Sequence, residues 1–258
     1  MIPTAGSPRV VRCGGPVAPP SVEAGAQPSG ALPECDVDAK QQIRERIWAR
    51  MERDGAARFP GARGRIPNFR GAEAAAARLA ELPEWQAARV VKANPDAPQL
   101  PVRRHAHREG RTLYMAVPRL ADERPFVLVT GDPTIKRAMA EGRPLALDDL
   151  QPVDLIVCGT VVVNREGVRI GKGGGFSDLE FALLAERGLV GERTTIVTTV
   201  HPLQVVDEPL PETEHDVRMD LVVTPDEVIR TPRRRRPPGL LWEHLDEDRR
   251  AAIPALRG

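Results

Sequence analysis

The chain has 258 residues, of which 41% are hydrophobic and 28% are charged, and this composition argues against a disordered, collagen-like or disulfide-rich protein. Its 37 basic and 36 acidic residues give a formal net charge of +1, which argues against a protein that coats nucleic acid or an anionic membrane. No apolar run approaches the roughly 20 residues of a membrane span, and the three cysteines form no disulfide framework, so we predict a cytoplasmic protein in a reducing compartment.

The two ends of the chain differ in composition from the middle. Residues 1–35 contain seven prolines, five glycines and no aromatic residue, so they bury too little apolar surface to offset the entropy lost on ordering. We predict a disordered extension over residues 1–35 and a folded domain over residues 36–232. Residues 233–258 are rich in Arg and Pro, and we predict that they form a short helix around residues 240–248 that packs on the domain.

The folded domain is predicted to begin with two helices. Asp38 and Gln41 have the spacing of a capping box. Apolar residues then recur on one helical face, at Ile43, Ile47, Trp48 and Met51. Gly55 ends this helix, and a second, Ala-rich helix is predicted over Gly71–Leu82, where Pro83 stops it.

From Val90 onward the pattern changes to short apolar runs rich in β-branched residues. The runs that we predict as strands are Val90–Val91, Leu113–Val117, Phe126–Val129, Asp154–Cys158, Thr194–Val200 and Leu221–Val223. Helical stretches separate several of them, notably Phe176–Arg187. Strands that are apolar throughout and alternate with helices indicate a mostly parallel sheet with helices on both faces. We therefore predict a three-layer α/β domain.

The densest chemical signal is the glycine-rich loop Gly171–Gly175, which follows the strand-like segment Val161–Val163 and precedes a predicted helix. Four glycines let backbone amides approach a ligand with no Cβ in the way, and the helix N-terminus and Lys172 add positive charge. The segment is neither a P-loop nor a dinucleotide fingerprint. It predicts a polyphosphate site; the alternative is a flexible turn before a helix that Ser177 and Glu180 cap.

Four features follow one another along the chain in a characteristic order. They are Lys40 with Arg44, the strand and turn over residues 154–167, the loop Arg169–Phe176, and His215-Asp216 followed by Asp220–Pro225. Together they resemble the 5-formyltetrahydrofolate cyclo-ligase family, over about residues 36–256. The resemblance implies a cyclo-ligase-like fold and an enzyme that uses ATP and Mg²⁺ to close 5-formyltetrahydrofolate to 5,10-methenyltetrahydrofolate, with release of ADP and phosphate.

The same resemblance assigns roles to individual residues. The catalytic charges are Lys172, Lys40 and Arg169. The nucleotide-binding residues are Gly171, Lys172, Gly173, Gly174, Gly175, Phe176 and Arg44. Asp178 is the implied Mg²⁺ ligand, directly or through water, and Phe69 and Phe176 are the implied stacking residues for folate. The implied partner is a reduced folate or a related heterocyclic small molecule, bound by a monomer or a homodimer.

The loop departs from the family pattern at a position that bears on the substrate. Family members with cyclo-ligase activity read Gly-Tyr-Tyr-Asp-Arg, whereas this chain reads Gly-Phe-Ser-Asp-Leu, ending at Leu179. The resemblance is greatest to a divergent branch, in which animal relatives carry an RNA-recognition module and some plant and bacterial relatives are linked to thiamine metabolism. Two alternatives therefore remain open: a paralogue that acts on another, thiamine-related heterocycle, and a non-catalytic protein that binds nucleotide or RNA.

Two further segments have more than one interpretation. Lys92 lies just before the turn Asn94-Pro95-Asp96; we predict this turn at the rim of the site, although the same residues can simply end a strand. The run Arg233–Arg236 has the composition of a nucleic-acid-binding segment. Because the whole chain is rich in Arg and prolines flank the run, we predict a solvated linker there.

Overall fold

The computed structural model describes residues 34–232 and 236–256, with the backbone alone described for residues 34–37. Its helices are α1 (Glu34–Arg53), α2 (Ala72–Ala80), α3 (Pro83–Ala87), α4 (Leu100–Arg108), α5 (Ile135–Glu141), α6 (Phe176–Glu186) and α7 (Glu247–Ala252). Its strands are β1 (Val90–Ala93), β2 (Thr112–Ala116), β3 (Phe126–Leu128), β4 (Arg143–Leu145), β5 (Leu155–Cys158), β6 (Val162–Asn164), β7 (Arg169–Ile170), β8 (Thr195–Thr199), β9 (Val205–Val206), β10 (Leu221–Val223) and β11 (Val228–Arg230). The predicted extension lies almost wholly outside the described residues.

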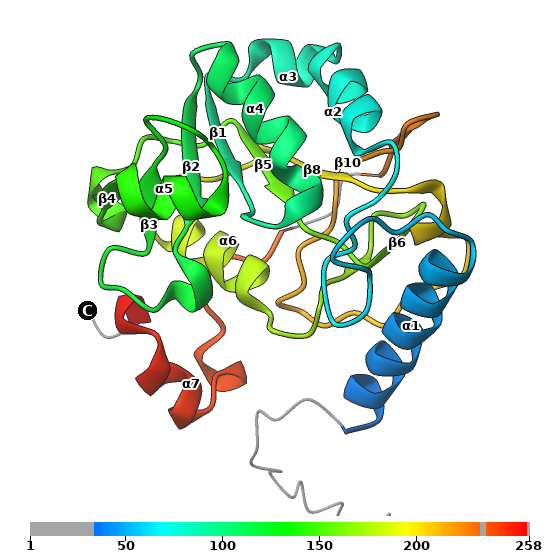
Figure 1. The fold of residues 1–258 in the computed structure, drawn as a ribbon. Helices are drawn as coiled ribbons and strands as arrows, with labels where there is room; N and C mark the ends of the chain where they lie inside the picture. Colours follow the sequence, from blue (N-terminus) through cyan, green and yellow to red (C-terminus); the bar gives the residue numbers. More distant parts are fainter. Residues whose placement is uncertain (1–33, 233–235, 257–258) are drawn as a thin grey trace, which may run out of the picture.

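Eight of the strands form one sheet in the order β11-β10-β8-β5-β1-β2-β3-β4, at the centre of the ribbon in Figure 1. From β10 to β2 every pairing is parallel, whereas β11, β3 and β4 add to the two edges in antiparallel orientation. The predicted mostly parallel sheet is confirmed. Because the chain runs from β1 outward to β4 and returns to β5 on the other side of β1, the strand order reverses between β1 and β5.

Side chains on successive residues of each strand point to opposite faces of this sheet. Along β5, Leu155 and Val157 pack in the core that contains residues of α2, α3, α4 and α5. Ile156 and Cys158 pack in the other core, together with residues of α6 and the C-terminal segment. The domain thus has three layers, as predicted, and strands that are buried on both faces read as continuous apolar runs.

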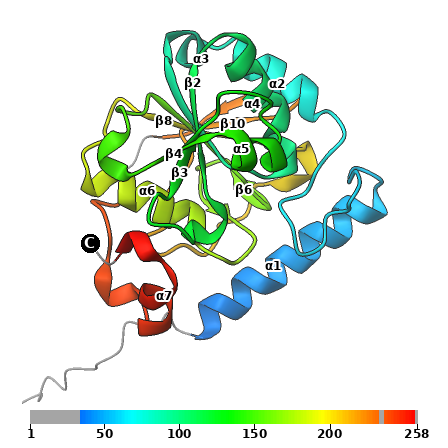
Figure 2. The same cartoon turned by 60° about the vertical axis from the view of Figure 1, so that its left-hand side comes forward.

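A smaller sheet of three strands, in the order β7-β6-β9, lies beside the first and carries α1 (Figures 1 and 2). The predicted apolar face of α1 packs here, with Ile47 and Trp48 against Val162 and Ile170. The strand-like segment 161–163 therefore belongs to a separate sheet. The sequence does not reveal this, because the strands of both sheets are short apolar runs. This sheet brings α1 beside the glycine loop that follows β7.

Three helix boundaries differ from the predictions. Because α1 begins at Glu34, Asp38 lies inside the helix and does not cap it. Pro83 ends no helix but begins α3 at its first position, where a proline needs no amide hydrogen. Near the C-terminus, α7 begins at Glu247 rather than near residue 240, because the Asp246 side chain accepts a hydrogen bond from the Arg249 amide and caps the helix there.

The C-terminal segment, residues 236–256, packs against the domain at several points. Arg236 forms an ion pair with Asp220 at 2.7 Å and also donates to the Gly191 carbonyl, so the predicted solvated linker is wrong at this residue; residues 233–235 lie outside the described part of the chain. Three apolar side chains of the segment are buried in the core beside α6: Leu245, Ile253 and Leu256. No helix of the described chain combines the length and hydrophobicity of a bilayer span.

Replacing Gly167 with alanine is expected to destabilise the β6–β7 turn. Gly167 has a φ of 86°, and a Cβ there would lie 2.3 Å from the Met219 carbonyl oxygen, so the loss in unfolding free energy should exceed the roughly 1–2 kcal/mol of a left-handed residue alone. Gly188→Ala is the matched control, because Gly188 has a φ of 63° with open space around it. Urea unfolding measures both, and equal losses would contradict the expected clash.

Candidate functional site

A cavity of about 680 Å³ opens where the carboxyl ends of β1, β2 and β5 meet. The segments that follow these strands line it: residues 94–96 after β1, 116–119 at the end of β2, and Gly159 after β5. This position is beside the reversal of strand order, where open α/β sheets bind their ligands. Most of the remaining lining comes from α1, from residues 169–178 and 180, from residues 215–216 and from Arg249, and Gly64, Ile66 and Ile135 complete it.

The glycine loop forms one wall of the cavity and leads directly into α6. Gly173 and Gly175 have φ values of 109° and 63°, which favour glycine. Gly175 is the N-terminal cap of α6, with no side-chain cap, and Ser177 lies inside the helix, so the alternative capping box of Ser177 and Glu180 is not formed. Among the described residues the amides of Gly173–Gly175 donate to no partner. They are therefore available to an anion at the positive end of α6.

Six basic and four acidic side chains of the described chain line the cavity. Lys40, from α1, lies 2.5 Å from the Asp216 carboxylate, measured from Nζ to Oδ2. Lys172, in the loop, is half exposed, and its Nζ lies 3.4 Å from Asp96 Oδ1. Two predicted catalytic lysines that are far apart in the sequence thus lie at the same cavity, each with a carboxylate beside it.

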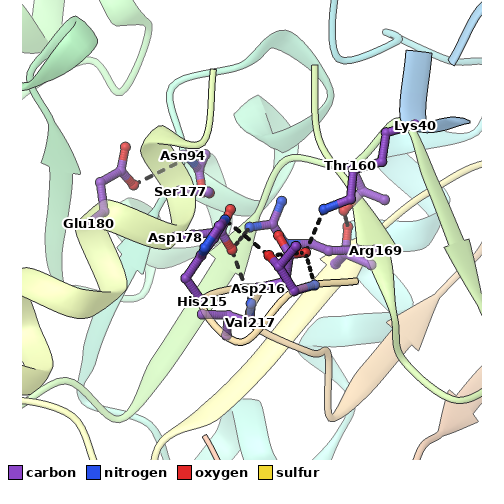
Figure 3. A network of polar contacts seen from close by, with 12 residues as sticks. Lys40, Asn94, Thr160, Arg169, Ser177, Asp178, Glu180, His215, Asp216 and Val217 are labelled. Atoms are coloured by element: carbon purple, nitrogen blue, oxygen red, sulfur yellow. Dashed lines mark hydrogen bonds and ion pairs between the residues drawn. The ribbon is translucent and has the colours of Figure 1, made fainter. Parts of the chain in front are cut away.

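Two arginines hold the loop and the start of α6 in place. Arg44 Nε donates to the Gly171 carbonyl at 2.7 Å. Arg169 is buried, and its Nη2 lies 2.5 Å from Asp178 Oδ1, an oxygen that also accepts from the Val217 amide at 3.1 Å. These contacts connect α1, β7, α6 and the segment before β10 around one wall of the cavity, and Figure 3 shows those of Arg169, Asp178 and Val217.

Asp216 holds together the segment of residues 213–216, which lies before β10. Its Oδ2 accepts from the Thr213 amide at 2.7 Å and from the Thr213 hydroxyl at 2.9 Å, as well as from Lys40. Burial alone would raise the pKa of Asp216, but Lys40 and Thr213 outweigh it and the pKa lies below its ordinary value. Next to it, His215 Nδ1 lies 3.1 Å from Nδ1 of His244 in the C-terminal segment, and burial lowers the pKa of His215.

The floor of the cavity is a buried polar network. Lys92 of β1 and Glu180 of α6 are 1% and 4% exposed and form an ion pair. Asn94 Nδ2 donates to the same carboxylate at 3.3 Å, and the Ser177 hydroxyl donates to Asn94 Oδ1 at 3.0 Å. Burial raises the pKa of the Glu180 carboxyl, and the Lys92 ammonium offsets this only in part. The segment predicted as a rim is thus part of the floor.

The structure corrects one predicted substrate contact. Phe69 is 0% exposed, packs in the core beneath α1, and meets the His201 ring edge-on with 6.1 Å between ring centroids. It does not line the cavity. Phe176, in contrast, is half-buried at the cavity wall, and the guanidinium carbon of Arg249 lies 5.8 Å from its ring centroid.

Three charged lining residues lie outside the site segments and family motifs that the sequence analysis singles out. Arg249 donates to the Gly174 carbonyl from the C-terminal segment. Arg119 has a left-handed φ of 60° in the 3-10 turn that follows β2, and Glu180 appears in the sequence analysis only as a possible cap. One signal for Glu180 is present in the sequence: Lys92 stands within an apolar strand, and a buried lysine requires a counter-charge. Arg249 has no comparable signal, because it lies in a charged stretch of the chain.

The comparisons with known proteins agree on one family. A model of the 5-formyltetrahydrofolate cyclo-ligase family matches residues 36–225. The methenyltetrahydrofolate synthase domain-containing protein of Mus musculus is 41% identical over 232 residues, which is 85% of this chain and 62% of that protein. The Homo sapiens protein of the same name is 39% identical over 233 residues, covering 85% and 61%. The chain therefore spans about three fifths of these relatives, and the family match ends before the C-terminal segment.

Two solved structures are similar at lower levels. The NMR structure of Aquifex aeolicus 5,10-methenyltetrahydrofolate synthetase has a TM-score of 0.48 at 20% identity, covering 76% of this chain and 94% of the other. A 5,10-methenyltetrahydrofolate synthetase from Mycoplasma pneumoniae has a TM-score of 0.43 at 11% identity, covering 71% and 97%. At these TM-scores, neither superposition adds to the sequence match.

Proposed function

Because the chain belongs to the 5-formyltetrahydrofolate cyclo-ligase family, we propose that it converts 5-formyltetrahydrofolate and ATP to 5,10-methenyltetrahydrofolate, ADP and phosphate. The observation that carries the proposal is the glycine loop, whose free amides and neighbouring Lys40 and Lys172 line a cavity at the carboxyl ends of parallel strands. The same cavity extends to a polar floor, which leaves room for a second ligand beside the phosphates.

The proposed reaction depends mainly on alignment and on neutralising charge. The amides of Gly173–Gly175 hold the phosphates, while Lys40 and Lys172 balance the charge that develops as the terminal phosphoryl group moves to the formyl oxygen. The substrate's N10 then attacks the formyl carbon and loses its proton, and phosphate leaves with the former formyl oxygen. Arg169, whose side chain is 3% exposed and bound to Asp178, acts as a positioning residue rather than through direct contact with phosphate.

The Asp178 carboxylate offers oxygen donors of the kind that Mg²⁺ prefers. Its Oδ1 is occupied by Arg169 and the Val217 amide, whereas its Oδ2 accepts no hydrogen bond from the described residues. In the described chain no group of three or more His, Cys, Asp or Glu side chains could hold a metal alone. Mg²⁺ is usually held by one or two carboxylates together with phosphates, and there it would neutralise phosphate charge.

The test is an assay for methenyltetrahydrofolate, followed by its near-ultraviolet absorbance, with purified protein, 5-formyltetrahydrofolate, ATP and Mg²⁺. We expect ATP-dependent product formation that falls by about tenfold to a hundredfold in Lys172→Ala, the effect of removing one charged hydrogen-bond donor. Lys136→Ala, on the exposed side of α5 and outside the cavity, is the control and should keep full activity. No product from protein that still binds ATP would refute the proposal.

A second candidate is the same kind of ATP-dependent chemistry on another, thiamine-related heterocycle. It is favoured by the Ser177-Asp178-Leu179 sequence, in which Ser177 belongs to the floor network and Leu179 is buried. A Tyr at the Ser177 position would give the floor a larger surface, whereas Leu179 packs in the core outside the cavity lining. The absorbance assay separates the two candidates, because only the first consumes 5-formyltetrahydrofolate.

A further inference from the structure

The floor of the cavity contains two charged side chains that the proposed reaction does not use. Lys92 and Glu180 are both almost fully buried, and the Lys92 ammonium donates to Glu180 Oε2. A buried ion pair seldom adds stability over apolar residues of similar volume. Because Glu180 also lines a ligand cavity, the pair is better explained by binding than by folding.

The positions of both residues follow from their elements. Lys92 shares with Val90 the face of β1 that packs toward α6, because side chains alternate along a strand. Glu180 lies three residues after Ser177 in α6, so that the two side chains lie on one face of the helix, toward the cavity. A strand face and a helix face thus meet at a single polar point beneath the glycine loop.

The Glu180 carboxylate presents one oxygen to a ligand. Its Oε2 accepts from Lys92 Nζ and from Asn94 Nδ2, whereas its Oε1 accepts no bond from the described residues, and Glu180 lines the cavity. Because the Ser177 hydroxyl donates its proton to Asn94 Oδ1, its lone pairs are also available as acceptors. In Figure 3, Glu180, Asn94 and Ser177 form a group separate from the Lys40 and Asp216 pair.

The floor therefore offers acceptors, whereas the glycine loop offers donors. A phosphate or carboxylate ligand would be repelled by Glu180 Oε1. Because Lys92 already balances the charge of Glu180, a neutral ligand with an N–H donor suits the floor better than a cationic ligand. Beside it lie Pro95, Ala116 and Val117, which give a largely apolar lining that suits a planar ring.

We propose that Glu180 is a specificity-determining residue, whose Oε1 accepts a hydrogen bond from an amino group on a pyrimidine ring of the substrate. The inference rests on the proposed use of this cavity for ATP and a heterocycle, and two sources share the chemistry: the 2-aminopyrimidine half of a reduced pterin, and a simple 4-aminopyrimidine. Glu180 lies four residues beyond Phe176, about 6 Å along the helix axis. The ring of the substrate is thus placed close to the glycine loop, where the substrate would receive the terminal phosphoryl group of ATP.

The test measures binding by calorimetry in the absence of ATP, with two pairs of ligands. One pair is 5-formyltetrahydrofolate and the same compound with hydrogen in place of its 2-amino group; the other is 4-amino-5-hydroxymethyl-2-methylpyrimidine and its deaminated form. The full chain is compared with the double variant Lys92→Met/Glu180→Leu, which leaves neither an unpaired charge in the floor nor a hydrogen-bond acceptor at position 180. Glu186→Gln removes a carboxylate charge from the exposed end of α6, outside the cavity, and is the control.

In at least one pair, the unaltered chain and Glu186→Gln should bind the amino form about tenfold to a hundredfold more tightly than the deaminated form. The double variant, with an unchanged circular dichroism spectrum, should lose this preference. A preference that survives in the double variant, or that is absent from both pairs, overturns the inference. If the chain binds folate without preferring the amino form, the inference about Glu180 is overturned and the proposed function stays intact. If the chain binds no folate but prefers the amino form of the pyrimidine pair, the result supports Glu180 and refutes the proposed function.

Discussion

Replacing Lys92 with methionine is expected to lower the free energy of unfolding by about 3–5 kcal/mol, because it leaves the buried Glu180 carboxylate without its counter-charge. The methionine fills much of the volume of the lysine stem, so the loss comes from the unpaired charge rather than from a cavity. Urea unfolding at neutral pH measures the change. Lys136→Met, at an exposed position of α5, is the matched control and should stay within about 0.5 kcal/mol of the unaltered chain.

A second substitution and a change of pH distinguish the lost counter-charge from altered packing. The double variant Lys92→Met/Glu180→Gln buries no charge and should recover most of the stability. Burial already raises the pKa of Glu180, and loss of Lys92 removes the ammonium that opposes this shift. In the single variant the folded state therefore binds a proton more tightly than the unfolded state, so the loss should shrink as the pH falls from about 8 to about 5. A loss that is independent of pH and persists in the double variant would contradict this explanation.

Replacing Lys40 with alanine is expected to lower kcat/KM for the proposed cyclo-ligase reaction by about 10²–10³-fold, the usual effect of removing one preorganised donor from a developing negative charge. Lys40 has a larger expected effect than Lys172, because its side chain is 12% exposed against 51% and its field is less screened by water. The measurement is the initial rate of methenyltetrahydrofolate formation at several substrate concentrations.

Two comparisons show whether this loss is local. Arg53→Ala removes a positive charge from an exposed position at the end of the same helix, outside the cavity, and should leave kcat/KM unchanged. Asp216 keeps its two hydrogen bonds from Thr213 in the Lys40→Ala variant, so its segment should stay ordered. A fall of less than tenfold, or an equal fall in Arg53→Ala, would remove Lys40 from the proposed catalytic residues.

The main sheet could be predicted from the sequence because its central strands are buried on both faces. Val90–Ala93 and Leu155–Cys158 are apolar apart from Lys92, and such runs between helices are typical of parallel strands. The short edge strand β4 has Arg and Pro at exposed positions, and β11 ends in an exposed Arg, so that their sequences resemble loops. The start of α1 was misplaced because a capping box also occurs by chance in the polar face of a long helix.

The candidate site was predictable only where its residues are consecutive. Gly171–Gly175 stands out because the loop, its lysine and the following helix are local features. The role proposed for Glu180 depends on a strand residue 88 positions away in the sequence, and that of Arg249 on a loop residue 75 positions away. Local residue spacing predicts neither of these two contacts. Phe69 was misassigned because an aromatic residue has the same sequence signal in a core as at a ligand.

The contacts of Arg249 also determine when the glycine loop acquires its full set of partners during synthesis. Residues 236–256 leave the ribosome after every strand of both sheets, and folding proceeds as segments emerge. A nascent chain that has just completed β11 can form the sheet, but the Gly174 carbonyl still lacks its guanidinium donor. The core beside α6 then also lacks Leu245, Ile253 and Leu256. The wall of the cavity that contains the glycine loop is thus completed last, by a segment that follows the residues matched by the family model.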